Sequence, residues 1–128
     1  MIEESYVSFN TAKLLKEAGF EANLKTMHVE EEKDEWTFWD SGAKRSDYNY
    51  FDDTIACPTQ ALAERWLREV YNVAIYSLYD DDMEQWFYVV DAFTKNPVIN
   101  GFQSGSEYDD YESAFEEGLQ EAIKLIKK

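Results

Sequence analysis

Two residues have side chains suited to nucleophilic catalysis, the single histidine His28 and the single cysteine Cys57. A Ser/His or Cys/His pair would have to use His28, but no Gly-x-Ser-x-Gly sequence is present, and the local alternation places His28 on the solvent side of a strand. Cys57 precedes Pro58 at a helix start, where a thiol pKa can fall. Asp52 and Asp53 nearby oppose thiolate formation. We therefore expect Cys57 to be a small buried residue and predict no catalytic residue.

An acidic run suggests calcium binding. Asp80–Asp82 with Glu84 resemble the start of an EF-hand loop, which needs Gly at its sixth position and Glu at its twelfth. Those positions hold Gln85 and Asp91, so we interpret the run as a solvated turn and predict no metal site and no cofactor. Among 27 acidic residues, some carboxylate pair would always suit glycoside hydrolysis, so such a pair is no evidence for it.

Composition predicts a folded, strongly acidic domain. The 128 residues carry a net charge of −15, and 16% of them are aromatic, which provides enough apolar surface for a core. This length is typical of one domain, so we expect a single domain over 1–128. The charge argues against direct binding to nucleic-acid phosphates or anionic lipid, and favours either a basic partner or simple solubility.

The chain shows no sign of export or membrane insertion. It contains no apolar stretch of 18 residues or more, and its first residues lack the basic start and apolar segment of a signal peptide. One cysteine cannot form an internal disulfide. We therefore expect a cytoplasmic protein in a reducing compartment.

Apolar periodicity predicts three helices. The first has Ser8 as its N-cap and Gly19 just past its end. The second begins at Pro58 and stops at Asn72. The third has Asp109 as its cap, and apolar residues recur every three or four positions from 111 to 126. Gly118 lies within its apolar face, where we expect the close approach of another backbone.

Alternation and β-propensity predict five strands. A hairpin spans residues 24–40, with Met27 and Val29 facing inward, and a meander covers 73–79, 85–93 and 98–102. The second meander strand has apolar residues on both faces. Trp86, Tyr88 and Val90 lie on one face, and Phe87, Val89 and Phe93 lie on the other. We expect helices to cover one of these faces, and the loop or a second subunit to cover the other.

The predicted fold is α+β, with three helices packed on one antiparallel sheet of four or five strands in the order α-β-β-α-β-β-β-α. A long segment at about 40–57 shows no period of 2 or 3.6, and loops of this length are commonly functional. We predict that a partner binds there. The candidate binding residues are Tyr48, Tyr50, Phe51, Asp52 and Asp53.

Three segments carry a family resemblance: Pro58–Val70, Tyr111–Leu119, and Tyr6–Phe9 together with Thr11–Lys16. They resemble small acidic proteins encoded by Bacteroidales genomes and their phages or mobile elements. The resemblance covers roughly half of the chain and leaves out the 40–57 segment. It implies a genomic setting and carries no catalytic motif.

Two functions from different classes are favoured after these exclusions, and an enzyme ranks third. The first is a non-enzymatic, cytosolic accessory or interaction protein of phage or mobile-element type, with a protein partner that is basic and with a homodimer as a further possibility. The alternative is an acidic DNA mimic that occupies the groove of a nucleic-acid-binding defence enzyme. Mimicry requires carboxylates spaced like phosphates along one face.

Overall fold

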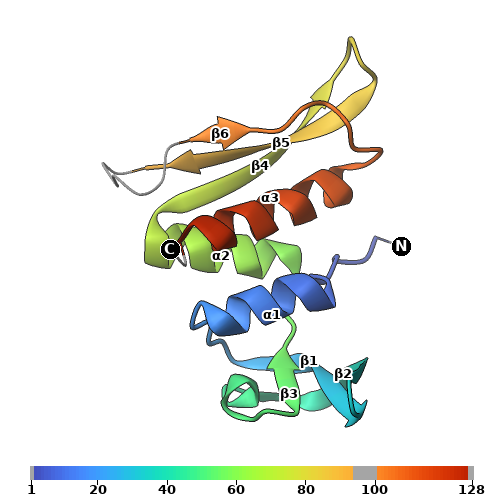
Figure 1. The fold of residues 1–128 in the computed structure, drawn as a ribbon, viewed down its shortest axis with the longest axis vertical. Helices are drawn as coiled ribbons and strands as arrows, with labels where there is room; N and C mark the ends of the chain where they lie inside the picture. Colours follow the sequence, from blue (N-terminus) through green and yellow to red (C-terminus); the bar gives the residue numbers. More distant parts are fainter. Residues whose placement is uncertain (1, 94–100, 127–128) are drawn as a thin grey trace. The chain divides into compact units, whose positions relative to one another are not determined.

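The computed structural model describes residues 2–93 and 101–126. The chain divides into two compact units, Met1–Thr59 and Gln60–Lys128, referred to as unit 1 and unit 2. Each unit has its own three-stranded antiparallel sheet (Figure 1). The α+β class, the three helices and the antiparallel pairing are confirmed, whereas the expected single sheet of four or five strands is wrong. The single-domain organisation stays a prediction.

Unit 1 contains one α-helix, three strands and one turn of 3₁₀-helix. The helix begins where predicted, because the Ser8 Oγ accepts a hydrogen bond from the Thr11 N–H at 3.2 Å. It is followed by Gly19 at a φ of +90°, a left-handed conformation that favours glycine. The sheet order is β2-β1-β3. The elements are α1 (Phe9–Glu17), β1 (Leu24–Glu32), β2 (Glu35–Arg45), η1 (Tyr48–Tyr50) and β3 (Thr54–Ala56).

The expected irregular segment at 40–57 needs correction. Its first part continues β2 as far as Arg45, and its last part forms β3, which pairs with β1 through Met27 and Ala56. Apart from Cys57, only the stretch between Arg45 and Thr54 lies outside strands, and η1 occupies part of it. Sequence alternation missed β3 because three residues are too few to show a period.

The described residues of unit 2 form two helices and a meander. Its sheet order is β4-β5-β6, and the third strand comprises Phe102–Gln103. The predicted strand residues 98–100 lie outside the described residues. The predicted stop of the second helix is confirmed, since Asn72 has a φ of 58° just after it. The elements are α2 (Gln60–Tyr71), β4 (Val73–Asp80), β5 (Gln85–Ala92), β6 (Phe102–Gln103) and α3 (Tyr111–Ile126).

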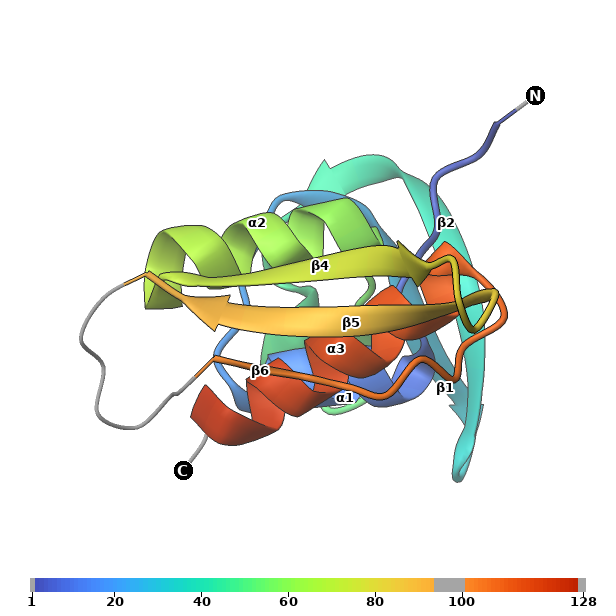
Figure 2. The ribbon, with the colours of Figure 1, turned by 90° about the horizontal axis from the view of Figure 1, so that it is seen from above.

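Both helices of unit 2 lie on the same face of its sheet, and α3 runs across β4 and β5 (Figures 1 and 2). Gly118 allows this packing, because a Cβ there would lie 2.8 Å from Ile75 Cγ2 and 3.1 Å from Tyr88 Cβ. The close approach predicted at Gly118 is therefore made by side chains of two strands rather than by another backbone. This contact shows that α3 covers the face of the sheet on which Ile75 and Tyr88 lie.

Two helix starts differ from the sequence prediction. Pro58 lies two residues before α2, which begins at Gln60. The cap of α3 is Asp110 rather than Asp109, because its Oδ1 accepts a hydrogen bond from the Ser113 N–H at 2.7 Å. Adjacent aspartates offer the same capping chemistry, so the sequence could not distinguish them.

Candidate functional site

His28 is buried, which overturns the expectation that it faces solvent. Only 9% of the residue is exposed, and its ring meets those of Phe9 and Phe38 edge-on, at centroid distances of 5.5 and 6.0 Å. Its Nε2 has no hydrogen-bond partner. Desolvation by burial lowers the pKa of His28, so the imidazole is neutral near pH 7. The side chain is part of an aromatic cluster.

Cys57 is fully buried, as expected. Its Sγ lies 3.4 Å from the carbonyl oxygen of Val7, to which the thiol donates a hydrogen bond. A thiol in this position is a small core residue.

Within residues 2–93 and 101–126, no three His, Cys, Asp or Glu side chains are close enough to hold a metal ion together. In the same part of the chain, every helix is too short or too polar to cross a bilayer. The acidic run at Asp80–Asp82 forms a turn tied to its own backbone, because the Asp80 Oδ1 accepts a hydrogen bond from the Asp82 N–H at 3.0 Å.

The residues predicted to bind a partner divide between core and surface. Tyr48 is buried, with its hydroxyl 2.7 Å from Ser41 Oγ, so it is structural. Tyr50 is 78% exposed, and Phe51 is also exposed. Asp52 and Asp53 are exposed as well.

The same segment is held against α1. The Lys16 ammonium donates hydrogen bonds to the carbonyls of Phe51 at 2.6 Å and Thr54 at 3.1 Å. The Asn49 amide donates to Phe20 O at 2.9 Å, and its oxygen accepts from the Ala56 N–H at 2.8 Å. These bonds fix the backbone of the segment and leave Tyr50 and Phe51 projecting.

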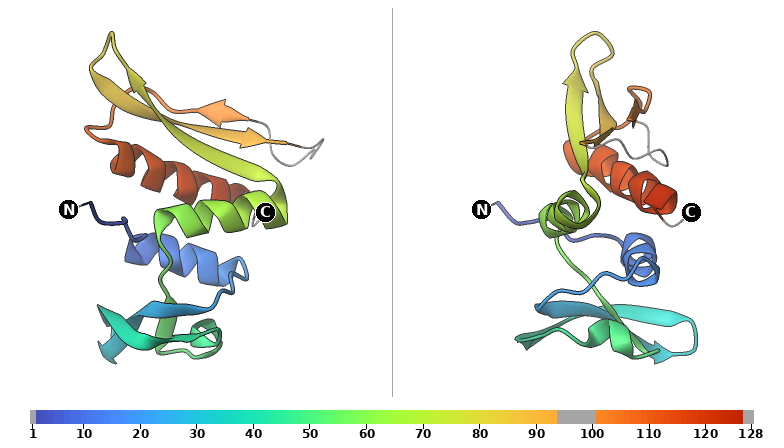
Figure 3. Two further views of the ribbon diagram at one scale, coloured as in Figure 1. Left: turned by 180° about the vertical axis from the view of Figure 1, so that it is seen from behind. Right: turned by 90° about the vertical axis from the view of Figure 1, so that its left-hand side faces the viewer.

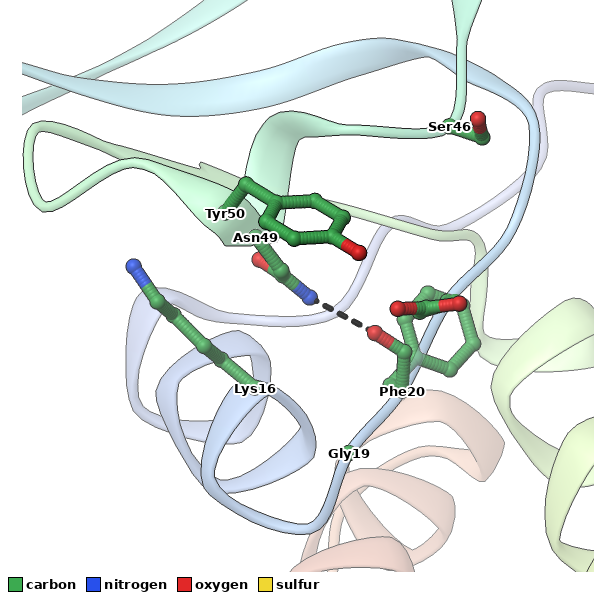
Figure 4. A pocket seen from close by; sticks show the side chains of 7 residues that line it. Lys16, Gly19, Phe20, Ser46, Asn49 and Tyr50 are labelled. Carbon is green, nitrogen blue, oxygen red and sulfur yellow. Dashed lines mark hydrogen bonds between the residues drawn. The ribbon is translucent and has the colours of Figure 1, made fainter.

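Two hollows of unit 1 border this segment. One of about 180 Å³ lies beside Gly19 and Phe20, with the Tyr50 ring and the Asn49 amide above it (Figure 4). The other, of about 440 Å³, is lined by Trp36 and other side chains. Lys16 and Asn49 line both hollows, yet their polar groups already bond to backbone. The two polar side chains that the hollows share are therefore engaged in holding the fold of unit 1.

The larger candidate surface is on unit 2. Strand pairing places Tyr76 beside Val89 and Leu78 beside Phe87. Ile75 and Tyr88 contact Gly118 of α3, so alternation along the strands places these four side chains on the other side of the sheet. This side, called the outer face, lies opposite α2 and α3 (Figure 3). Tyr76 is 43% exposed and Leu78 is 47% exposed, and Phe87 and Val89 are partly exposed. No element of unit 2 among the described residues covers this apolar surface.

The expectation of two apolar faces on the meander is confirmed in outline. Tyr88 faces α3, as the contact with Gly118 shows, and the alternation of strands therefore places Phe87 and Val89 on the other side. The sequence prediction missed Tyr76 and Leu78 as part of this surface. Their alternation with Ile75 and Ser77 indicated that Tyr76 and Leu78 share one face of β4. Only the pairing register shows that this face and the Phe87 and Val89 face of β5 form one patch.

Acidic side chains border the outer face. They are the turn residues Asp81, Asp82 and Glu84, which are exposed, together with Asp80 at the end of β4 and Asp91 at the far end of β5. The described basic residues of unit 2 all lie on its helices. Each is within 4 Å of a glutamate: Arg65 with Glu69, Arg68 with Glu64, and Lys124 with Glu121. The outer face is thus apolar at its centre and negative at its border.

Comparisons of the chain with protein-family models, with curated proteins and with solved structures give no match. The class supported by fold and site is therefore stated from the structure alone: an acidic α+β protein of two compact units with an exposed apolar sheet face.

Proposed function

We propose that this chain is a non-enzymatic interaction protein that binds a protein partner through the outer face of unit 2. The observation that carries the proposal is the exposure of Tyr76 and Leu78 beside Phe87 and Val89 on a sheet face that no described helix of unit 2 covers. Contiguous exposed apolar surface with a polar border is typical of interaction sites. Tyrosine is also among the residues enriched at the centre of such sites.

The burial of the two nucleophile candidates supports a role without catalysis. His28 and Cys57 are both enclosed in unit 1, and general-base or nucleophilic catalysis requires contact with substrate. The proposal places the protein in the cytosol, as an accessory protein of the phage or mobile-element type that the family resemblance implies.

DNA mimicry is the weaker alternative. It requires a row of negative charge along a surface, whereas the outer face is apolar at its centre and carries carboxylates at its ends. In unit 1 the acidic run Glu30–Glu35 lies around a hairpin turn, and in unit 2 the run Asp80–Glu84 does the same. Local clusters at turns favour steering of a basic protein partner more than imitation of a phosphate backbone.

The test compares partner capture by matched variants. Leu78→Asp places a charge in the outer face, and Val70→Asp places the same charge on α2, where Val70 is 55% exposed. Tagged wild-type protein and both variants are used to capture partners from host-cell lysate, which are quantified by mass spectrometry. We expect Leu78→Asp to reduce the partner at least tenfold and Val70→Asp to leave it unchanged.

A third variant tests the surface predicted from sequence. The double substitution of Tyr50 and Phe51 by alanine removes the exposed rings of that segment without touching its backbone bonds. If this variant loses the partner while Leu78→Asp retains it, the binding surface is on unit 1 and the proposal for unit 2 is wrong. Circular dichroism of each variant confirms that it is folded.

A further inference from the structure

β2 is an edge strand whose residues are exposed. It lies at one end of the sheet order β2-β1-β3, with β1 as its neighbour among the described strands (Figure 1). Every residue of β2 is exposed except Trp36, which is partly exposed. Phe38 is 44% exposed and Trp39 is 50% exposed. Aromatic side chains on an exposed edge strand are typical of a site where another strand pairs.

The hydrogen bonds of β1 fix which backbone groups of β2 point away from the sheet. The Glu30 N–H donates to Asp53 O at 3.0 Å, and the Cys57 N–H donates to Thr26 O at 3.1 Å. Even-numbered residues of β1 therefore bond toward β3, and odd-numbered ones bond toward β2, because successive residues of an antiparallel strand point to opposite sides. The register places the odd-numbered residues of β1 opposite odd-numbered residues of β2.

Three even-numbered residues of β2 consequently present their backbones to the free edge. They are Trp36, Phe38 and Asp40, and their N–H and C=O groups have no partner among the described residues. The regular part of the strand ends at Asp40, because the register with β1 shifts beyond it and Gly42 has a φ of 76°. The edge therefore offers one short, regular row of unpaired donors and acceptors.

We propose that β2 of one copy of the chain pairs with β2 of a second copy, antiparallel about a two-fold axis at Phe38. In this register Phe38 faces Phe38 of the second copy, and Trp36 faces Asp40. An axis at Phe38 uses all three free positions on both copies, whereas an axis at Trp36 or Asp40 would run into the hairpin turn or the irregular end of β2. The inference concerns unit 1 and is independent of the proposed function.

The side chains of β2 suit this register. The Phe38 ring lies on the α1 side of the sheet, with centroid distances of 6.0 Å to the His28 ring and 5.1 Å to the Tyr6 ring. Pairing brings the two Phe38 rings together beside both Tyr6 rings. On the opposite side of the sheet, Trp39 comes next to Thr37 of the second copy. Cross-strand pairs of two aromatic residues, or of an aromatic and a β-branched residue, stabilise sheets.

The charges of β2 favour a second copy over an unrelated strand. The strand begins beside the mainly acidic hairpin run Glu30–Glu35 and ends with Lys44 and Arg45. Arg45 is paired with Asp47 at 2.8 Å, and Lys44 is exposed. An antiparallel two-fold pair brings the basic end of each strand toward the acidic end of the other, whereas a parallel pair would place like charges side by side.

The first experiment measures association and amide exchange of the full chain as its concentration is raised. Physiological salt is used, because it screens the repulsion between two copies of net charge −15. We expect the mass by light scattering to rise from monomer to dimer. We also expect the Trp36, Phe38 and Asp40 amides to exchange about tenfold more slowly in the dimer. The Thr37 and Trp39 amides are the internal control, since their bonds to β1 protect them at every concentration.

A matched pair of variants isolates the backbone donor. Asp40→Ala removes the carboxylate, and Asp40→Pro removes the carboxylate together with an N–H that points to the free edge, a place where proline is tolerated in sheets. Each copy loses one hydrogen bond across the axis. We expect Asp40→Pro to dimerise at least about fivefold more weakly than Asp40→Ala. Exchange in the wild-type protein gives an answer even if Asp40→Pro fails to fold.

A disulfide trap tests the register. Residues at position 38 face each other across the axis with Cα atoms about 5.5 Å apart, within reach of a disulfide. Residues at position 40 are separated by about 13 Å along the strands. We therefore expect Phe38→Cys to form a covalent dimer under mild oxidation and Asp40→Cys to stay monomeric on a non-reducing gel. Cys57 is buried in both variants.

The outcomes distinguish this inference from the proposed function. A monomer at every concentration, equal dimerisation of Asp40→Pro and Asp40→Ala, or a covalent dimer of Asp40→Cys in place of Phe38→Cys would overturn it. A monomeric chain that loses its captured partner with Asp40→Pro but keeps it with Asp40→Ala would show that a foreign strand occupies the edge, which would also overturn it. Capture by Leu78→Asp decides the proposed function in every case.

Discussion

Gly118 of α3 lies so close to Ile75 of β4 that a Cβ on the glycine would come within 2.8 Å of Ile75 Cγ2. We expect Gly118→Ala to destabilise the protein by about 1–2 kcal/mol, because overpacking outweighs the gain in helix propensity. Urea denaturation measures the change. Gly105→Ala is the matched control, since a Cβ there meets nothing within 4 Å, and it should be nearly neutral. A stabilised Gly118→Ala would contradict tight packing between helix and sheet.

His28 makes the stability of unit 1 depend on pH. Burial lowers its pKa in the folded state, so below an unfolded-state value of about 6.5 the unfolded chain binds more protons than the folded one. His28 therefore costs no stability at higher pH. As the pH falls from the pKa of His28 in the unfolded chain towards its lower pKa in the folded protein, His28 progressively destabilises the fold. We expect His28→Phe to reduce the loss of stability between pH 7 and 5, measured by thermal denaturation at each pH. An identical pH profile for both proteins would contradict a desolvated His28.

Glu64 is held at the edge of β4 by competing effects. Burial raises its pKa, while Arg68 and the Ile75 N–H favour the charged form. We expect Glu64→Ala to destabilise by about 1–3 kcal/mol, because it leaves the Ile75 N–H without its acceptor, and to speed exchange of that amide. Glu64→Gln keeps an acceptor and should retain most of the protection. Unchanged Ile75 exchange in Glu64→Ala would show that the carboxylate does not block this edge.

Cys57 should be unreactive while unit 1 is folded. Its thiol is fully buried, so modification by a thiol-specific aromatic disulfide requires opening of the structure. We expect the reaction to be slow in buffer, and to accelerate over the same urea range in which circular dichroism reports unfolding. Fast modification of the native protein would mean that Cys57 is accessible and would support a reactive thiol instead.

The sequence determined the elements whose signals are local. Ser8 and Gly19 bound the first helix because capping and left-handed backbone are chemical properties of those residue types. The apolar repeat of the last helix was long enough to predict its bounds. Alternation predicted the two apolar faces of the second meander strand. The existence of an outer apolar surface could therefore be predicted, although not all of the residues that form it.

The tertiary structure decided what depends on contacts between distant residues. Strand partners are chosen by pairing between segments, which placed β3 beside β1 and divided the strands into two sheets. His28 alternates like a surface residue, yet Phe9 from α1 encloses it. The contact of Glu64 with the Ile75 N–H is likewise invisible in sequence, because hydrogen-bond direction along a strand is fixed only when its neighbour is known.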